Sequence, residues 1–337
     1  MAESVHDDVV EEIMLGLDAN DLVSCRSVCK SWHSLISTSR FINRHLSYSY
    51  NKDRCSNELS HRRIFLEHND GGFRLVGSCN GLVCISTFSS KVILGKYKLL
   101  VGNPLTREEK QLKLPAWIGL VLCWGFGYDS SRDDYKVIIG CQKGRNQTCV
   151  QVLSLKSNVW RVIGYVNYKF ISKVGILCNG ALHWIVKDQK KKKLIISYDL
   201  CEDEFKEIPQ PDNAGYDSTY TSHVGVMNEC LCICISIYSF AGGVWLMKNY
   251  NVKQSWEHLV YWKNYDIVHL LRSPKDESFF NDDASWFLNT SDRHLFWLRH
   301  YIDAPIFVQS LVSPHVNGRP KRDKRSAKWV LLFSFLL

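Results

Sequence analysis

Apolar residues near the start of the chain recur with the spacing of α-helices. Val9, Val10, Ile13 and Leu17 follow one another at intervals that place them along one side of a helix. Two further short helices are expected before residue 46. Three helices in about 40 residues cannot bury all of their apolar side chains among themselves. The surplus indicates a module that docks onto a partner.

The pattern changes after this helical segment. Residues 47–62 are rich in Ser, Asn, Lys, Arg and His and are predicted to form a linker. From Arg63 onward, short runs of β-branched and aromatic residues are separated by Gly, Asn and Asp, which is typical of strands joined by turns. The body of the chain is therefore expected to be all β.

The body also repeats itself. The segments VQVLSLKSNVWRVI and LIISYDLCEDEFKEI share one layout, and WLMKNYNVKQSWEHL is a looser third copy. Trp160, Phe205 and Trp256 hold the same aromatic place in the three copies. A second element, Cys-Asn-Gly followed by an apolar strand, begins at Cys79 and again at Cys178, and Asn-Gly is a strong hairpin signal. Blades of a β-propeller recur at a similar period, so we expect about six of them. A β-sandwich or an irregular barrel is the alternative.

Composition narrows the class of protein. The chain has 337 residues, is 45% hydrophobic and contains 13 cysteines. Its first ten residues include three acids and no apolar core of a signal peptide, so we expect reduced thiols. No cysteine pairs have zinc-site spacing. No apolar run reaches the roughly 18 residues of a membrane span. We expect no metal, no cofactor and no membrane contact.

Charge is uneven along the chain. The net charge is +8, yet residues 1–50 carry seven acids and four bases, whereas residues 318–329 carry six bases and one acid. An acidic head and a basic tail argue against one continuous nucleic-acid surface. The run Lys190–Lys193 is interpreted as a solvated hairpin loop, with recognition of an acidic target as the alternative. Residues 321–325 are a candidate nuclear localisation signal, so we expect a cytoplasmic and/or nuclear location.

No set of residues indicates catalysis. The pair Asp7-Asp8 is better explained by helix capping than by acid–base chemistry. Gly125-Phe126-Gly127 lacks the context of a phosphate-binding loop. The sequence shows no recognisable set of a nucleophile, a general base and a residue that orients the base. An enzyme built on a propeller is the least favoured of the functions considered.

The head resembles an F-box, in the segment VHDDVVEEIMLGLDANDLVSCRSVCKSWHSLISTSRFINRHL. The body resembles the kelch-like F-box-associated region of plant F-box proteins. The segments that carry this resemblance occur in the order of that family: GSCNGLVCIS, VGNPLTREEKQL, GFGYDSSRDDYKVI, CNGALHWIV and IISYDLCEDEFKEIP. The resemblance implies an α+β multidomain chain with a three-helix F-box at residues 1–46, a linker at 47–62, a propeller-like domain at 63–314 and a basic, then apolar, tail at 315–337.

The same resemblance implies a function. The F-box would dock onto the adaptor subunit of an SCF-type cullin-RING ubiquitin ligase, and the propeller would hold an unknown target protein. By position, the adaptor-binding residues would be Val5, His6, Val9, Val10, Ile13, Leu17, Leu22, Val28 and Trp32. Two positions depart from the family pattern, because Val5-His6 replaces a Leu-Pro pair and Asp18 replaces a second proline. These departures leave a second hypothesis open, a propeller with a degenerate F-box that acts as a decoy or outside the ligase.

Overall fold

The computed structural model describes most of the chain as two compact units. The described residues are 7–55, 62–63, 73–87, 98–116, 118–144, 147–212, 216–227, 229–237, 241–263 and 306–315. One unit comprises Met1–Leu114 with Ile306–Leu337, and the other comprises Pro115–Pro305. Val5, His6 and the candidate localisation signal at 321–325 lie outside the described residues.

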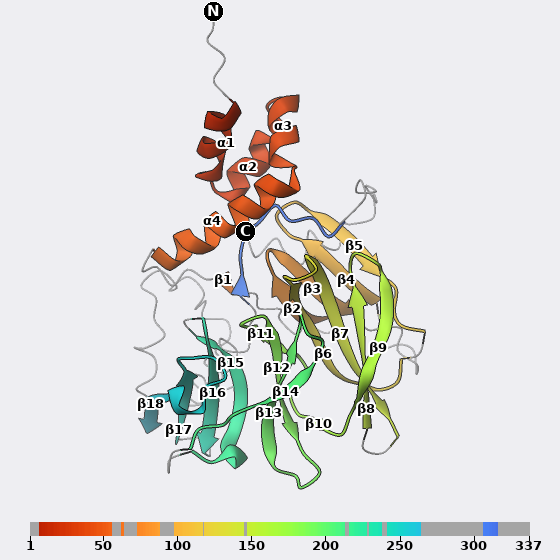
Figure 1. Ribbon diagram of the computed structural model, residues 1–337, viewed down its shortest axis with the longest axis vertical. Helices are drawn as coiled ribbons and strands as arrows, with labels where there is room; N and C mark the ends of the chain where they lie inside the picture. The colour runs from red at the N-terminus through yellow and green to blue at the C-terminus, as the bar shows by residue number, and fades with distance from the viewer. Residues whose placement is uncertain are drawn as a thin grey trace, which may run out of the picture. The chain divides into compact units, whose positions relative to one another are not determined.

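The first unit begins with four helices, one more than expected. They are α1 (Asp7–Leu15), α2 (Ala19–Cys25), α3 (Lys30–Ile36) and α4 (Ser39–Cys55). Figure 1 shows the three short helices grouped together and α4 extending beyond them. Residues 47–55, expected to be linker, are therefore helical. Tyr50 holds this part of α4 by donating a hydrogen bond to Asn80 Oδ1 at 3.1 Å. Polar composition alone did not reveal this tertiary support.

The helices share a core with later parts of the chain. Its buried members are Met14, Leu15, Ala19, Leu22, Ile36, Phe41, Leu105 and Leu311. Leu105 comes from a turn of the first sheet, and Leu311 comes from the C-terminal segment of the same unit. The helical module is thus completed by side chains that lie far away in sequence. Part of the apolar surplus noted in the sequence is therefore buried within the protein itself.

In the part of the chain that the structure describes, four larger antiparallel sheets follow, each with its strands hydrogen-bonded mainly in chain order. The first contains β2 (Phe73–Cys79), β3 (Leu82–Thr87), β4 (Lys98–Asn103) and β5 (Glu108–Leu112). The second contains β6 (Val121–Asp129), β7 (Asp134–Lys143), β8 (Gln147–Ser154) and β9 (Val159–Val166). The third contains β10 (Lys169–Phe170), β11 (Ile176–Cys178), β12 (Ala181–Lys187), β13 (Lys193–Asp199) and β14 (Phe205–Ile208). The fourth contains β15 (Thr221–Met227), β16 (Cys230–Ile237), β17 (Ala241–Met247) and β18 (Trp256–Lys263). Successive meanders of this kind are the blades of a propeller-like domain, as the sequence predicted.

The remaining regular elements of the described residues are short. The 3₁₀ turns η1 (Ser218–Tyr220) and η3 (Lys253–Ser255) flank strands of the fourth sheet. In the first unit, β1 (Arg62–Arg63) pairs with β19 (Ile306–Phe307). The segment after β19 is tied to the first sheet by Asn103, whose side-chain amide donates to the carbonyls of Ser310 and Val312, each at 2.8 Å. No helix among these described parts has the length and apolarity needed to cross a membrane.

The hairpins predicted from Asn-Gly are confirmed. Asn80 and Gly81 have φ angles of 52° and 80°, and Asn179 and Gly180 have φ angles of 49° and 73°. Both pairs lie between directly paired strands, β2–β3 and β11–β12. Positive φ at both central residues matches the right-handed twist of a hairpin, and Asn and Gly tolerate it best.

The predicted repeat corresponds to the last two strands of three sheets. Trp160 pairs with Leu153 in the second sheet, Phe205 with Tyr198 in the third, and Trp256 with Met247 in the fourth. Each aromatic residue follows a turn containing a residue in the left-handed region, which is Asn158, Asp203 and Asn251 in the three copies. The recurring layout therefore encodes one turn geometry and one packing position.

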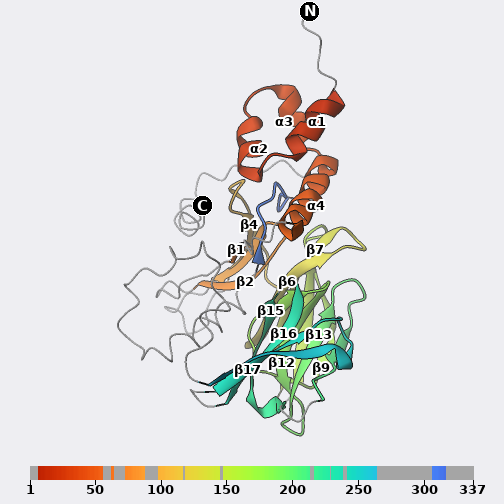
Figure 2. The same cartoon turned by 90° about the vertical axis from the view of Figure 1, so that its left-hand side faces the viewer.

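The second and third sheets pack on a shared core within the second unit. Its largest buried members include Trp184 and Tyr198, which meet Ile138, Val150 and Val152 from the neighbouring sheet. Figure 2 shows β15 and β16 of the fourth sheet beside β12 and β13 of the third, and β15 contacts both β11 and β12.

A buried charge cluster adds to this junction. The Lys136 ammonium lies 2.7 Å from Asp129 Oδ2 on the second sheet and 2.9 Å from Asp203 Oδ1 on the third. Burial raises the pKa of Asp129, but hydrogen bonds from Lys136, Ser131 and Arg132 outweigh it and hold that pKa below its ordinary value. The cluster therefore acts as an ionic clamp between two sheets.

Candidate functional site

Helix α1 carries two exposed apolar side chains. Val9 is 50% exposed and Ile13 is 63% exposed, and the two are four residues apart, so they share one face of the helix. Val10 is half-buried. Two aliphatic side chains that stay in water, on a helix with a well-formed core on its other face, mark a surface suited to a protein partner.

The other predicted contact residues divide between surface and core. Val28, in the turn after α2, is 62% exposed. Leu17 and Trp32 are half-buried and pack against the helical core. Leu22 is fully buried, so this structure does not present it on the surface predicted to bind the adaptor. Helical spacing places Ala19 and Leu22 on one face of α2, and packing against Ile36 and Phe41 makes that face the inward one.

Residues that sequence reasoning missed hold α1 in place. Arg44 on α4 forms ion pairs with Glu11, which is largely buried, and with Glu12 at 2.6 Å. His45 Nε2–H donates to the carbonyl of Leu17 at 2.8 Å. These contacts join residues about 30 positions apart, so no local pattern could have revealed them. They fix the orientation of α1 and therefore of Val9 and Ile13.

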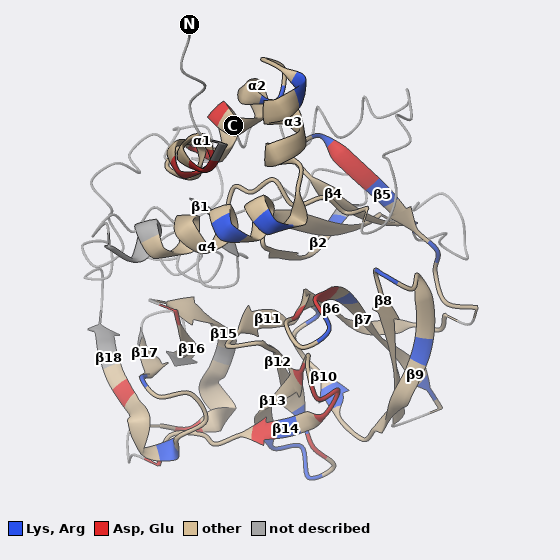
Figure 3. Ribbon diagram, turned by 45° about the horizontal axis from the view of Figure 1, so that its top comes forward, with Lys and Arg blue, Asp and Glu red and all other residues tan. Residues whose placement is uncertain are grey.

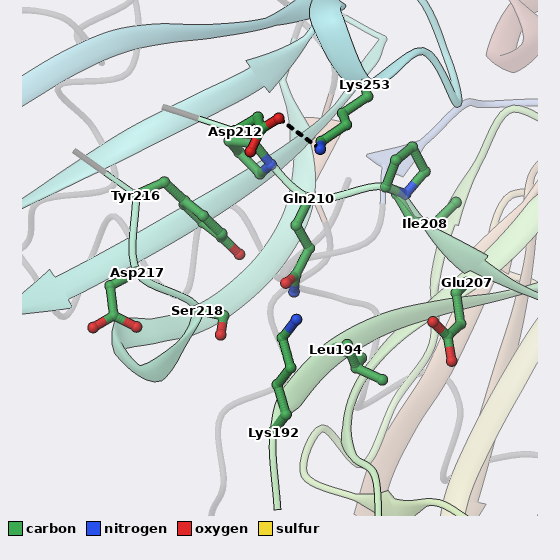
Figure 4. Close-up of a pocket in the computed structure, with 12 residues that line it drawn as sticks. Lys192, Leu194, Glu207, Ile208, Gln210, Asp212, Tyr216, Asp217, Ser218 and Lys253 are labelled. Carbon is green, nitrogen blue, oxygen red and sulfur yellow. Dashed lines mark hydrogen bonds and ion pairs between the residues drawn. The ribbon is translucent and has the colours of Figure 1, made fainter. Parts of the chain in front are cut away.

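The second unit contains an open groove of about 590 Å³. It is lined by Lys192, Leu194, Glu207, Ile208, Pro209, Gln210, Pro211, Asp212, Tyr216, Asp217, Ser218 and Lys253. Figure 4 shows these side chains arriving from the third sheet, from the connection that follows it and from η3. The prolines, Leu194, Ile208 and Tyr216 provide apolar surface, and the charged groups lie around it.

Most charged groups of the groove already have partners. Lys253 pairs with Asp212 at 2.7 Å. Glu207 accepts a hydrogen bond from the Tyr168 hydroxyl at 2.8 Å. Asp217 accepts from the backbone N–H of Thr219 at 2.7 Å, which caps η1. The groove thus presents apolar surface between charged groups that mostly have partners within the protein.

The described residues do not assemble a recognisable reaction centre. Within the ranges given above, no group of three or more His, Cys, Asp or Glu side chains is placed to hold a metal ion. Burial raises the pKa of the Cys141 thiol to about 11 and that of Cys178 to about 12. Thiols with such pKa values are poor nucleophiles, because the thiolate is the reactive form.

Comparison with known proteins identifies the family. Residues 4–44 match the F-box domain, and residues 35–306 match the F-box associated beta propeller domain. The chain belongs to the F-box proteins that carry an F-box-associated β-propeller. The resemblance noted in the sequence is thereby confirmed, and the helical module is the F-box.

Curated relatives of this F-box protein come from Arabidopsis thaliana. It is 27% identical to the F-box/kelch-repeat protein At3g23880, over 91% of this chain and 95% of that protein. It is 28% identical to F-box protein At3g07870, over 75% of this chain and 71% of the relative. It is also 28% identical to F-box protein CPR1, over 74% of this chain and 70% of the relative. The similarity therefore spans both the F-box and the propeller.

Proposed function

We propose that this F-box protein is the substrate receptor of an SCF-type cullin-RING ubiquitin ligase. Its F-box binds the adaptor subunit, and its propeller binds the target protein. The observation that carries the proposal is the exposed aliphatic pair Val9 and Ile13 on α1 of a domain that matches the F-box family. The receptor itself performs no bond chemistry. It raises the concentration of the target near the transferring subunits.

Burial of the α1 surface would contribute measurably to the affinity of a complex. Full burial of a valine or isoleucine side chain contributes roughly 1.5–3 kcal/mol. About half of each side chain, Val9 and Ile13, is still exposed and available for burial. The pair would therefore contribute roughly 2–3 kcal/mol before the costs of association, which corresponds to roughly 30- to 150-fold in Kd.

The test is a binding measurement between the full chain and the purified adaptor subunit. The full chain is needed because Leu105 and Leu311 complete the core of the F-box. The double substitution Val9→Asp and Ile13→Asp should abolish binding. A matched control is Val159→Asp with Val162→Asp, which places the same charges at similarly exposed valines of β9. The control should bind like the natural chain, and equal binding by both variants would refute the proposed surface.

One further variant separates the receptor from the alternative of a degenerate F-box. His6→Pro restores part of the family pattern at a position where this chain departs from it. Comparable adaptor affinity of the natural chain and the variant supports a working receptor. Adaptor binding by the variant alone would favour the decoy function.

A further inference from the structure

The third sheet concentrates positive charge at one end. Residues 169–193 contain seven lysines and a single acidic residue, Asp188, so this segment holds net charge +6 of the chain's +8. Four of the lysines are consecutive, at 190–193, in the connection between β12 and β13. Figure 3 shows this loop in blue at the edge of the second unit.

The strand register brings more of these lysines together. Lys169 on β10 lies directly opposite Lys187 on β12, and Lys187 lies directly opposite Lys193 on β13. Directly paired residues project from the same face of a sheet, and like charges in such pairs destabilise it. Burial lowers the pKa of Lys193, and repulsion from Lys187 lowers it further. The register therefore aligns a row of three lysines across β10, β12 and β13, and Lys187 repels Lys193 within it.

The charge of Asp217 acts on Lys193 and partly offsets the repulsion from Lys187, but no ion pair within the described residues holds any of the three lysines. Lys169, Lys187 and Lys190–Lys192 form no ion pair with any residue that the structure describes. The Lys193 ammonium donates to two neutral carbonyls, those of Thr219 and Thr221, at 2.8 and 2.9 Å. Asp188 accepts from the backbone N–H of Lys192 at 2.8 Å and so serves the turn.

The lysine loop at 190–193 adjoins the groove of the second unit. Lys192 lines the groove, and Figure 4 shows its side chain directed toward Gln210. The row, the loop and Lys253 together supply seven lysines, against four acids at the same place: Asp188, Glu207, Asp212 and Asp217. Three of these acids have the partners described above: Asp212 pairs with Lys253, Glu207 accepts from Tyr168, and Asp217 caps η1. An excess of free ammonium groups thus borders an apolar surface made of proline, leucine and tyrosine side chains.

We propose that this face, formed by Lys169, Lys187, Lys190–Lys193 and the adjoining groove, is the target-binding site and that it takes an acidic peptide segment. Carboxylates of the segment pair with the lysines, and an apolar side chain beside them enters the groove. Charge complementarity selects this occupant, because anionic groups relieve the repulsion between aligned lysines. This inference rests on the proposed function, since it names the class of target that the receptor holds.

The test uses a short fluorescein-labelled peptide in which glutamates flank a Leu-Phe pair, with fluorescence anisotropy as the readout. The full chain should bind it, and a peptide with glutamine in place of glutamate should bind far more weakly. The triple variant Lys190→Gln, Lys191→Gln and Lys192→Gln should raise Kd about tenfold. Added salt should weaken binding of the natural chain, because exposed charge pairs are screened.

A matched control removes the same charge elsewhere. Lys98, Lys156 and Lys248 are exposed and lie outside the face, and their triple replacement by Gln should leave Kd unchanged. Equal loss in both triple variants would overturn the proposal, because binding would then follow net charge alone. Equal or tighter binding of a single-stranded oligonucleotide or of anionic vesicles to the same lysines would also overturn it, in favour of a general polyanion surface.

Adaptor binding by the same proteins distinguishes failure of this inference from failure of the receptor function. Suppose that the natural chain does not bind the acidic peptide, while the lysine variant binds the adaptor normally. The proposed target-binding face is then rejected, and the proposed receptor function is unaffected. Peptide binding that depends on the lysines, in a chain that does not bind the adaptor, keeps the face and rejects the ligase role.

Discussion

A change of pH from about 7 to about 4.5 perturbs one buried side chain in particular, His183 on β12. Its Nδ1 lies 3.1 Å from the carbonyl oxygen of Ile176, and its Nε2 lies 2.9 Å from the Tyr250 hydroxyl. A carbonyl can only accept, so Nδ1 carries the proton and Nε2 accepts from Tyr250. Burial lowers the pKa of His183 from 6.5 to about 4, because a charged imidazole would lose its hydration.

The sign of the effect follows from proton uptake by the unfolded chain. Between pH 6.5 and about 4 the unfolded imidazole binds a proton and the folded one does not. Above pH 6.5, His183 therefore does not lower the free energy of unfolding. As the pH falls below 6.5, the free energy of unfolding decreases. With about 1.36 kcal/mol for each unit of pKa, the loss approaches about 3 kcal/mol in total and amounts to about 2 kcal/mol between pH 7 and pH 4.5. The pKa values of Asp129 and Asp203 are lowered from 3.8, so their contributions are lost at more acidic pH.

The assay is urea unfolding followed by tryptophan fluorescence at several pH values in this range. The natural chain is compared with His183→Gln, which keeps a donor and an acceptor but does not titrate. The difference in free energy of unfolding between the two proteins should shrink by about 2 kcal/mol as the pH falls to about 4.5. Tyr250→Phe is the control, because it removes one hydrogen bond, costs about 1 kcal/mol and preserves the titrating group.

Parallel pH profiles of the natural chain and His183→Gln would refute this reasoning. The imidazole would then be protonated in the folded state, with a charge partner that the geometry does not supply. An NMR titration of the histidine signal that disappears in His183→Gln measures the same pKa directly. A folded-state pKa near 6.5 would contradict the burial argument independently of any unfolding experiment.

Three other substitutions probe the packing that positions the proposed surfaces. Lys136→Met removes the buried cation of the ionic clamp between the second and third sheets and should cost about 1–3 kcal/mol, measured by urea unfolding, because Asp129 and Asp203 lose a buried partner but keep their ion pairs with Arg132. A cost below about 1 kcal/mol would mean that the clamp is solvated. Gly175→Ala would place its methyl group against the Trp184 ring and should lower the free energy of unfolding by about 1–3 kcal/mol. Gly164→Ala is the control, because the space around Gly164 is open. Equal thermal midpoints for the two variants would contradict the packing around Gly175. Asn103→Ala leaves two carbonyls of the C-terminal segment without their donor, and limited proteolysis should release that segment faster than from the natural chain.

Several features of this F-box protein were determined by the sequence itself. The Asn-Gly turns at 80–81 and 179–180 form because these residues tolerate positive φ, a property of the residues rather than of their surroundings. The recurring aromatic positions, such as Trp160 and Phe205, marked the strands that end each sheet because turn geometry and strand pairing are local. Apolar spacing in α1 likewise identified Val9 and Ile13 as a shared face, and the structure leaves both exposed.

Other features were decided by tertiary structure. Leu22 was indistinguishable from its exposed apolar neighbours until packing with Ile36 and Phe41 turned it inward. The polar residues 47–55 became helix through contacts outside the helix, including the bond from Tyr50 to the first sheet.

The proposed target site depends on tertiary structure in the same way. The loop lysines were visible as a run, but strand register alone aligned Lys169 and Lys187 with Lys193. The groove beside them assembles from side chains between residues 192 and 253. Short-range preferences set turns and periodicity, whereas burial and charge alignment arise only when distant segments exclude water from one another.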